Sequence, residues 1–223
     1  LASARRWGLV VLLLPLAVSS VVMSLSMSAP RFLIDVILGP AELGYFAAVS
    51  HFVVLGAVAT GSVGHAILPV LAEAIRGRRE REFWRQLIAI MAAVQLACGL
   101  GIVASVFLGG ELLRFLYGNA FAGQAVLLTA AAVAAGPVYC ASIAANGCYA
   151  AGLRRGLLVS QVVALLTVML TTLLALGSWG NFGAFGGMLA GGMIQLIFCL
   201  VFLRRFWRRC RMQDLHALTE RCS

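Results

Sequence analysis

The chain has 223 residues, of which 62% are hydrophobic and only 11% are charged. A water-soluble domain carries roughly a quarter of its residues as charged side chains, so this composition excludes an ordinary soluble enzyme. A helix that crosses a membrane needs about 20 apolar residues, so the length allows about six spans with short loops. The formal charge is +9, because 17 arginines and no lysines stand against eight acidic residues.

Six apolar runs follow one another along the chain. None has the two-residue alternation of a barrel strand, and each is long enough to cross a membrane. They predict an all-α fold, with six transmembrane helices in one bundle over residues 1–203 and a basic tail over residues 204–223. The first run continues past the small residues at which a cleaved signal peptide would end, which favours a span. The expected spans are residues 8–37, 45–75, 87–108, 121–153, 156–176 and 182–203.

The arginines gather at one end of the expected spans. Fifteen of the 17 lie at that end, and only Arg31 and Arg114 lie at the other. Positive charge is retained on the cytoplasmic side of short loops, so both termini are predicted to be cytoplasmic. The arginines form no basic groove interleaved with aromatic residues, so we expect no nucleic acid partner. The basic tail, with Phe206 and Trp207, is expected to lie on anionic lipid headgroups.

Polar residues of the first span share one helical face. Ser20, Ser24, Ser28, Arg31 and Asp35 follow at spacings of 4, 4, 3 and 4. This stripe predicts a water-filled cavity whose groups bind sugar hydroxyls or phosphate, with Ser24, Ser28, Arg31 and Asp35 as candidates. The alternative remains open: the serines allow close helix packing, and Arg31 pairs with Asp35 at the outer interface.

Two other spans carry polar candidates. His51 and His65 lie about 21 Å apart along the second span, which excludes a shared metal ion, and His51 is a candidate cavity residue. In the fourth span, Tyr139 and Asn146 share one face and complete the candidate set. The adjacent Gly136-Pro137 pair predicts a break or bend near the middle of the membrane.

The sixth span contains a row of small residues. Gly183, Gly187 and Gly191 recur every four residues and are followed by Gln195. Such a row lets two helix backbones approach closely, so it predicts a packing seam.

No motif of covalent chemistry is present. The sequence has no nucleophile elbow, phosphate loop, zinc-helix motif or paired-carboxylate site, and its six cysteines have no paired spacing. We therefore expect no catalytic residue, no metal ion and no cofactor, and we expect that the protein is not an enzyme. A membrane-embedded sugar transferase would need clustered acids or a His beside an acid on a loop.

Several short motifs together resemble one family. In chain order they are APRFLIDVILGPAELGYFAA at 29–48, ILP at 67–69, LLRFLYGN at 112–119, AAGLR at 150–154 and NFGAFGG at 181–187. In this order and spacing, the chain resembles the carboxy-terminal half of a polysaccharide repeat-unit flippase of the O-antigen type. That family belongs to the multidrug/oligosaccharidyl-lipid/polysaccharide exporter superfamily.

The resemblance implies a transporter built from two six-helix bundles around a cavity that opens to one side at a time. Family members move undecaprenyl-pyrophosphate-linked sugars to the periplasmic leaflet of the bacterial inner membrane. Arg31 would then hold the pyrophosphate or an acidic sugar. The chain would be one bundle, working with a missing amino-terminal bundle or a second copy. Two alternatives stay open: a drug or metabolite antiporter of the same superfamily, and a non-transporting membrane component of a polysaccharide assembly complex.

Overall fold

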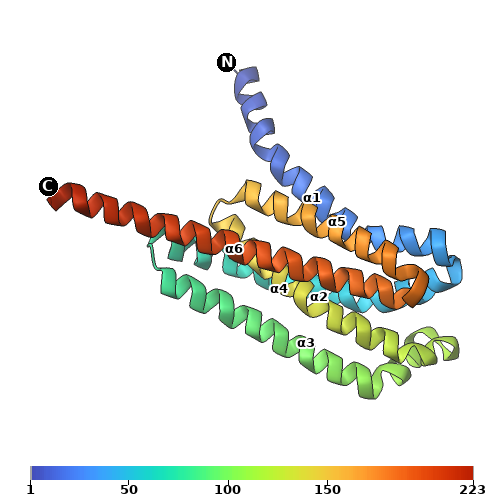
Figure 1. Cartoon of the computed structure of the whole chain (residues 1–223). Helices are drawn as coiled ribbons and strands as arrows, with labels where there is room; N and C mark the ends of the chain where they lie inside the picture. The colour runs from blue at the N-terminus through green and yellow to red at the C-terminus, as the bar shows by residue number, and fades with distance from the viewer. Residues whose placement is uncertain (1, 223) are drawn as a thin grey trace.

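The computed structural model describes the backbone of residues 2–222 and the side chains of residues 18, 19 and 21–212. Within this part of the chain all regular structure is helical (Figure 1). A short 3-10 helix, Asn119–Gln124, precedes the fourth long helix. The side chains of Ser20, Arg5, Arg6 and Arg221, and most of the predicted tail, lie outside the described side chains. The long helices are α1 (Ala2–Leu38), α2 (Pro40–Arg76), α3 (Glu80–Tyr117), α4 (Ala125–Ala150), α5 (Arg154–Trp179) and α6 (Asn181–Cys222).

The all-α fold class is confirmed. Six helices of the described chain are long and apolar enough to cross a membrane. Most helices extend beyond the expected spans, and α3 does so at both ends, since it runs from Glu80 to Tyr117 where residues 87–108 were expected. The fourth helix begins at Ala125, because residues 119–124 form the 3-10 turn. The sixth helix continues past residue 203 into the expected tail, where no Gly or Pro follows Gly192 to end it.

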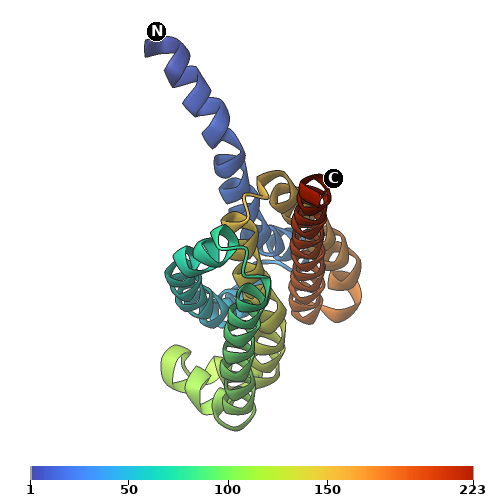
Figure 2. The same ribbon diagram turned by 90° about the vertical axis from the view of Figure 1, so that its left-hand side faces the viewer.

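Helix α4 lies at the centre of the bundle and α3 lies at its edge. Fifteen of the 26 residues of α4 are buried, whereas only five of the 38 residues of α3 are. Helix α4 packs against α2, α3 and α6, while α1 packs mainly along α5. Figure 2 shows α3 standing beside α4 on the outside of the bundle. The core is therefore organised around α4, with α6, α3 and α2 packed against it.

The sequence predicted a break or bend at Pro137. No break occurs there, because helix α4 runs from Ala125 to Ala150 as one helix with Pro137 inside it, and the bend stays a prediction. Helix α6 comes close to the α4 backbone at this point, since a Cβ on Gly192 would lie 2.9 Å from the Val138 nitrogen. Close packing of α6 here supports the helix across the proline, which cannot itself donate a backbone hydrogen bond.

The predicted packing seam of α6 is confirmed. A Cβ on Gly183 would lie 2.7 Å from the Ala175 carbonyl carbon of α5. A Cβ on Gly187 would collide with the Thr172 hydroxyl, and one on Gly191 would collide with Val168. The absence of side chains at these three glycines is what allows α5 and α6 to pack backbone against backbone.

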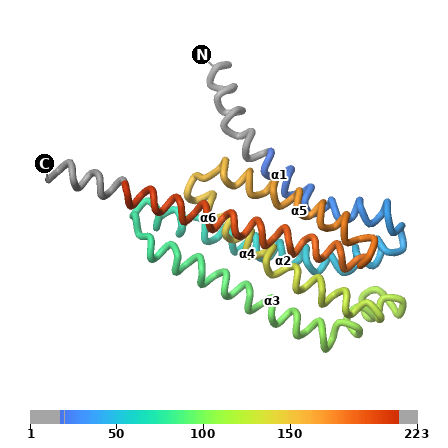
Figure 3. Tube along the Cα trace, in the orientation of Figure 1, coloured from blue at the N-terminus to red at the C-terminus, as the bar shows by residue number. Residues whose placement is uncertain are grey.

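The arginines segregate to one end of the described structure, which we call the basic end. It comprises the α2–α3 turn, the α4–α5 turn and residues 204–212 of α6 (Figure 3). Arg79 pairs with Glu82 at 2.9 Å, and Arg211 pairs with Glu80 at 2.6 Å, so α6 is tied to the start of α3. The opposite end carries Arg31 and Arg114. The described arginines of the basic end are Arg76, Arg78, Arg79, Arg81, Arg85, Arg154, Arg155, Arg204, Arg205, Arg208, Arg209 and Arg211.

Candidate functional site

Arg31 is half-buried on α1, near the opposite end of the bundle. Its Nη2 donates a hydrogen bond of 3.1 Å to Ser50 Oγ on α2. The Ser50 hydroxyl is buried and donates in turn to the Ala47 carbonyl at 3.0 Å. The Arg31 Nε is buried and has no partner among the described residues. A guanidinium has five N–H donors, so Arg31 retains donors that its surroundings do not use.

Asp35 lies one helical turn from Arg31 but does not neutralise it. The Asp35 side chain is exposed, and among the described side chains no ion pair joins it to Arg31. The pairing that the sequence left open is therefore absent from the described structure. Arg31 is positioned by a neutral serine and keeps a full positive charge, which favours an anionic ligand.

Several polar side chains of α1 and α2 face outward within the spans. Ser24 and His51 are exposed, and Ser28 is half-buried. On α2, His51, Ser62 and His65 share one exposed face, and each histidine lies about 10 Å of helical rise from the middle of the helix. Polar groups at this depth are costly when they face lipid. These faces of α1 and α2 are therefore suited to water or to another protein surface rather than to hydrocarbon.

Tyr139 and Asn146 lie between α4 and α2. Tyr139 donates a buried hydrogen bond of 2.6 Å to the Val53 carbonyl, while Asn146 donates to the Ser142 carbonyl at 3.1 Å. A Cβ on Gly56 would collide with the Tyr139 ring and hydroxyl, and a Cβ on Gly64 would collide with the Asn146 amide. Two glycines of α2 thus make room for two polar side chains of α4. Tyr139 joins α4 to α2 and also lines the groove described below, whereas Asn146 bonds within its own helix, and the role of both in substrate binding stays a prediction.

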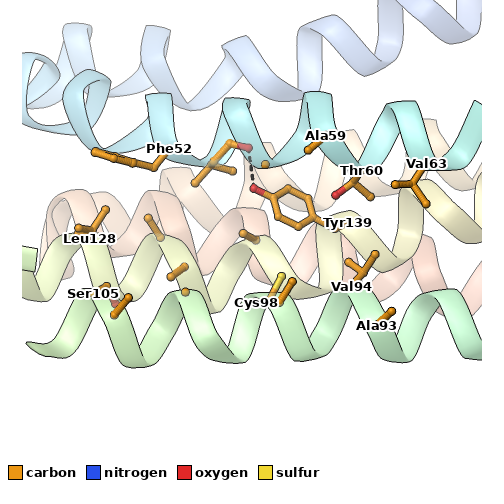
Figure 4. Close-up of a pocket in the computed structure, with 18 of the residues that line it drawn as sticks. Phe52, Ala59, Thr60, Val63, Ala93, Val94, Cys98, Ser105, Leu128 and Tyr139 are labelled. Carbon is orange, nitrogen blue, oxygen red and sulfur yellow. Dashed lines mark hydrogen bonds between the residues drawn. The ribbon is translucent and has the colours of Figure 1, made fainter. Parts of the chain in front are cut away.

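An apolar groove of about 680 Å³ lies between α2, α3 and α4. Figure 4 shows Phe52 and Thr60 of α2 facing Val94 and Cys98 of α3, with Tyr139 of α4 at the base. Sequence reasoning missed this groove because it searched for polar residues. The available signal was the row of small residues on α3, where Ala93, Ala97 and Gly101 recur every four positions.

Three of the motifs that carry the family resemblance, at residues 29–48, 112–119 and 181–187, lie at the opposite end of the bundle, and the first and last of them are in contact there. Asn181 donates to both the carbonyl and the carboxylate of Glu42, at 3.1 and 2.6 Å. The Phe46 and Phe185 rings stack with centroids 4.8 Å apart. Gly39 lies in the α1–α2 turn at a φ of +86°, a left-handed conformation that favours glycine. These contacts fix the α1–α2 turn, and through it the end of α1 that carries Arg31.

Metal-binding residues do not gather in the described part of the chain: no three His, Cys, Asp or Glu side chains come together there. Cys140, Cys148 and Cys199 are buried free thiols in the helices.

Comparison with known proteins gives one informative match. The chain is 29% identical over 119 residues to a Staphylococcus aureus protein named capsular polysaccharide biosynthesis protein CapF. The match covers 53% of this chain and 30% of that protein, so the relative is much longer than the matched region. No protein-family model matches the chain, and no solved structure matches it.

Proposed function

We propose that the chain is one half of a membrane transporter for a lipid-linked oligosaccharide of polysaccharide biosynthesis. In this proposal, it moves a polyprenyl-pyrophosphate sugar repeat unit across the bacterial inner membrane by alternating access. The observation that carries the proposal is Arg31, a half-buried cation that no described carboxylate neutralises, next to outward-facing polar groups at membrane depth. The similarity to a protein named for capsular polysaccharide biosynthesis supports the choice of cargo.

The physics of the task matches these features. An unassisted lipid-linked sugar would carry its pyrophosphate and hydroxyls through hydrocarbon, where a single charge costs at least about 2.5 kcal/mol. A surface with a free guanidinium and hydroxyls lowers this barrier, while the lipid tail stays in the bilayer. Arg31 binds the pyrophosphate or an acidic sugar, and Ser24, Ser28, Asp35 and His51 line its path. No covalent bond is formed or broken, so the protein acts as a carrier and not as an enzyme.

The transporter is completed by a second six-helix unit. The exposed side chains of His51, Ser62 and His65 need a polar or protein neighbour within the membrane. An amino-terminal bundle, or a second copy of this chain, covers them and closes the cavity. The greater length of the Staphylococcus aureus relative is compatible with such a second unit.

The basic end faces the cytoplasm and contacts anionic lipid headgroups in this proposal. Cys210 lies at the basic end, while Asn119 is exposed in the turn at the opposite end. In intact spheroplasts of an Asn119→Cys variant, a membrane-impermeant maleimide should label residue 119 and leave Cys210 unlabelled until the membrane is permeabilised. Labelling of Cys210 in intact spheroplasts, with residue 119 protected, would show that the protein has the opposite orientation in the membrane.

Depletion of the protein in the cell that makes it tests the function. We expect the lipid-linked repeat unit to accumulate in the inner membrane, with its sugars accessible only from the cytoplasmic side, while surface polysaccharide falls. Sugar accessibility is measured with a lectin on inside-out and right-side-out membrane vesicles. Increased drug sensitivity without accumulation of the lipid-linked sugar would contradict the proposal and favour an antiporter.

A further inference from the structure

The apolar groove between α2, α3 and α4 opens on the surface of the bundle within the spans. Ala59 and Val63 of α2 and Ala93 and Ala97 of α3 line it, and all four are exposed. On α3 the lining extends from Ile90 to Leu112, which is about 33 Å of helical rise and close to the thickness of a hydrocarbon core. The α3 wall of the groove is therefore about as long as a membrane is thick, whereas the α2 wall, from Phe52 to Val63, covers about half of that length.

The lining offers little to water. None of the lining residues is charged, and the Tyr139 hydroxyl is already bonded to the Val53 carbonyl. The Ser105 hydroxyl donates to the Ile102 carbonyl at 2.7 Å, within its own helix. The Thr60 hydroxyl and the Cys98 thiol are the other polar groups of the lining, and the described residues show no hydrogen bond for either. A groove with so few polar groups favours apolar ligands over water. The occupant is therefore a hydrocarbon chain.

The position of the groove relates it to Arg31. Phe52 and Val53, at one end of the groove, lie on the same turn of α2 as Ser50, which holds the Arg31 guanidinium. The two sites are on different sides of α2 and are therefore separated by about the 10 Å diameter of one helix. A lipid whose phosphate group is near Arg31 can reach the groove with its chain.

The shape of the lining favours a branched chain. Ala93, Ala97 and Gly101 leave a recess at each successive turn of α3, and Gly56 and Ala59 do so on α2. Methyl branches that recur along a chain can fill recesses that recur along a helix, as side-chain knobs fill holes. A straight acyl chain has no such branches.

We propose that this groove binds the isoprenoid chain of the lipid-linked substrate while Arg31 holds its phosphate end. The assignment rests on the proposed function for its choice of lipid. The groove guides the chain along the bundle as the sugar head moves, so the lipid and its head group stay together during transport.

Two glycines of α3 provide a matched test. Gly101 lines the groove and Gly99 does not, and a Cβ at either position meets no atom within 4 Å. The two positions point to opposite sides of the helix, since they are about 200° apart around it. Gly101→Phe fills the groove, whereas Gly99→Phe adds the same ring outside it.

The probe is a photoreactive undecaprenyl phosphate, added to the purified protein in vesicles of phosphatidylethanolamine and phosphatidylglycerol. Cross-links are mapped by peptide mass spectrometry, with a photoreactive phosphatidic acid as the acyl-chain comparison. We expect the isoprenoid probe to cross-link to the groove segments of α2 and α3, with at least fivefold lower yield in Gly101→Phe and unchanged yield in Gly99→Phe. The helical circular dichroism of each variant checks that it is folded.

Two results would overturn the assignment. Isoprenoid cross-links spread evenly over the outer helix faces of the unsubstituted protein would exclude a specific site. Equal loss of isoprenoid and phosphatidic acid cross-links in Gly101→Phe would make the groove a site for ordinary lipid. The probe carries no sugar and binding requires no transport. The cross-linking test can therefore succeed even if depletion of the protein causes no accumulation of lipid-linked sugar. It can also fail even if depletion does cause accumulation.

Discussion

Replacement of Arg31 by alanine should abolish surface polysaccharide in cells that depend on this protein, at an unchanged protein level. The substitution removes a cation that the described structure holds through Ser50 and leaves without a carboxylate partner. A hydrogen bond to a charged group contributes about 1.5–3 kcal/mol, so the loss of one or two such bonds to the pyrophosphate lowers the transport rate at least about tenfold. Arg31→Lys keeps the charge but loses the planar donor geometry, and should transport at an intermediate rate.

Arg114 provides the matched control for Arg31. It is the other arginine at the opposite end, it is exposed, and its Nε donates to Asn119 Oδ1 at 2.8 Å. Arg114→Ala therefore removes the same charge from the same end without touching the candidate site, and surface polysaccharide should stay within about twofold of its normal level, as expected when a solvent-exposed contact is lost. Surface polysaccharide is measured by immunoblot beside the membrane level of the protein. Normal polysaccharide in Arg31→Ala, or an equal loss in both variants, would remove Arg31 from the transport path.

Replacement of Gly183 by alanine should destabilise the bundle. The added methyl group would lie 2.7 Å from the Ala175 carbonyl carbon and 2.8 Å from its oxygen, and backbone atoms cannot rotate away. Helices α5 and α6 must then separate, at an expected cost of about 1–3 kcal/mol for overpacking a close contact. The measurement is the midpoint of thermal unfolding in detergent, followed by the loss of helical circular dichroism.

Gly186 lies three residues further along α6 and tests whether the effect comes from packing. It is exposed, and a Cβ there meets no atom within 4 Å. Gly186→Ala gains the same helix propensity as Gly183→Ala and should leave the midpoint unchanged or slightly raised. If the two variants unfold at the same temperature, the α5–α6 seam does not determine the stability of the bundle.

The periodicity of the sequence was sufficient to predict the helices and the α6 seam. The apolar runs determine where helices form. A glycine every four residues predicts a helix face without side chains, on which another helix can pack closely, whichever helix that is. The end of α6 was harder to predict, because charge marks where a span leaves the membrane but does not end a helix. Helix α4 also continues past its proline. The sequence did not predict this, because the close packing of α6 at Gly192 depends on tertiary structure.

The candidate site could be predicted only in part. Spacing correctly places Ser24, Ser28, Arg31 and Asp35 on one face of an ideal helix, but the partner of Arg31 is Ser50, on another helix. Polar residues such as Tyr139 have the same sequence pattern whether they line a cavity or join two helices. The difference depends on Gly56 of α2, which is 83 positions away in the chain. The groove is lined mostly by small and apolar residues, so a search for polar residues finds Tyr139 but not the groove around it.

Reconstitution tests the central claim most directly. The protein, together with its second six-helix unit, is placed in vesicles that contain a fluorescent polyprenyl-pyrophosphate oligosaccharide in both leaflets. The fraction of sugar that an external glycosidase can reach is then followed over time. The account predicts that the inner-leaflet sugar becomes accessible with the folded protein, and at least about tenfold more slowly with Arg31→Ala, as expected from the lost charged hydrogen bonds. Inner-leaflet sugar that stays protected in the presence of the folded protein would contradict it.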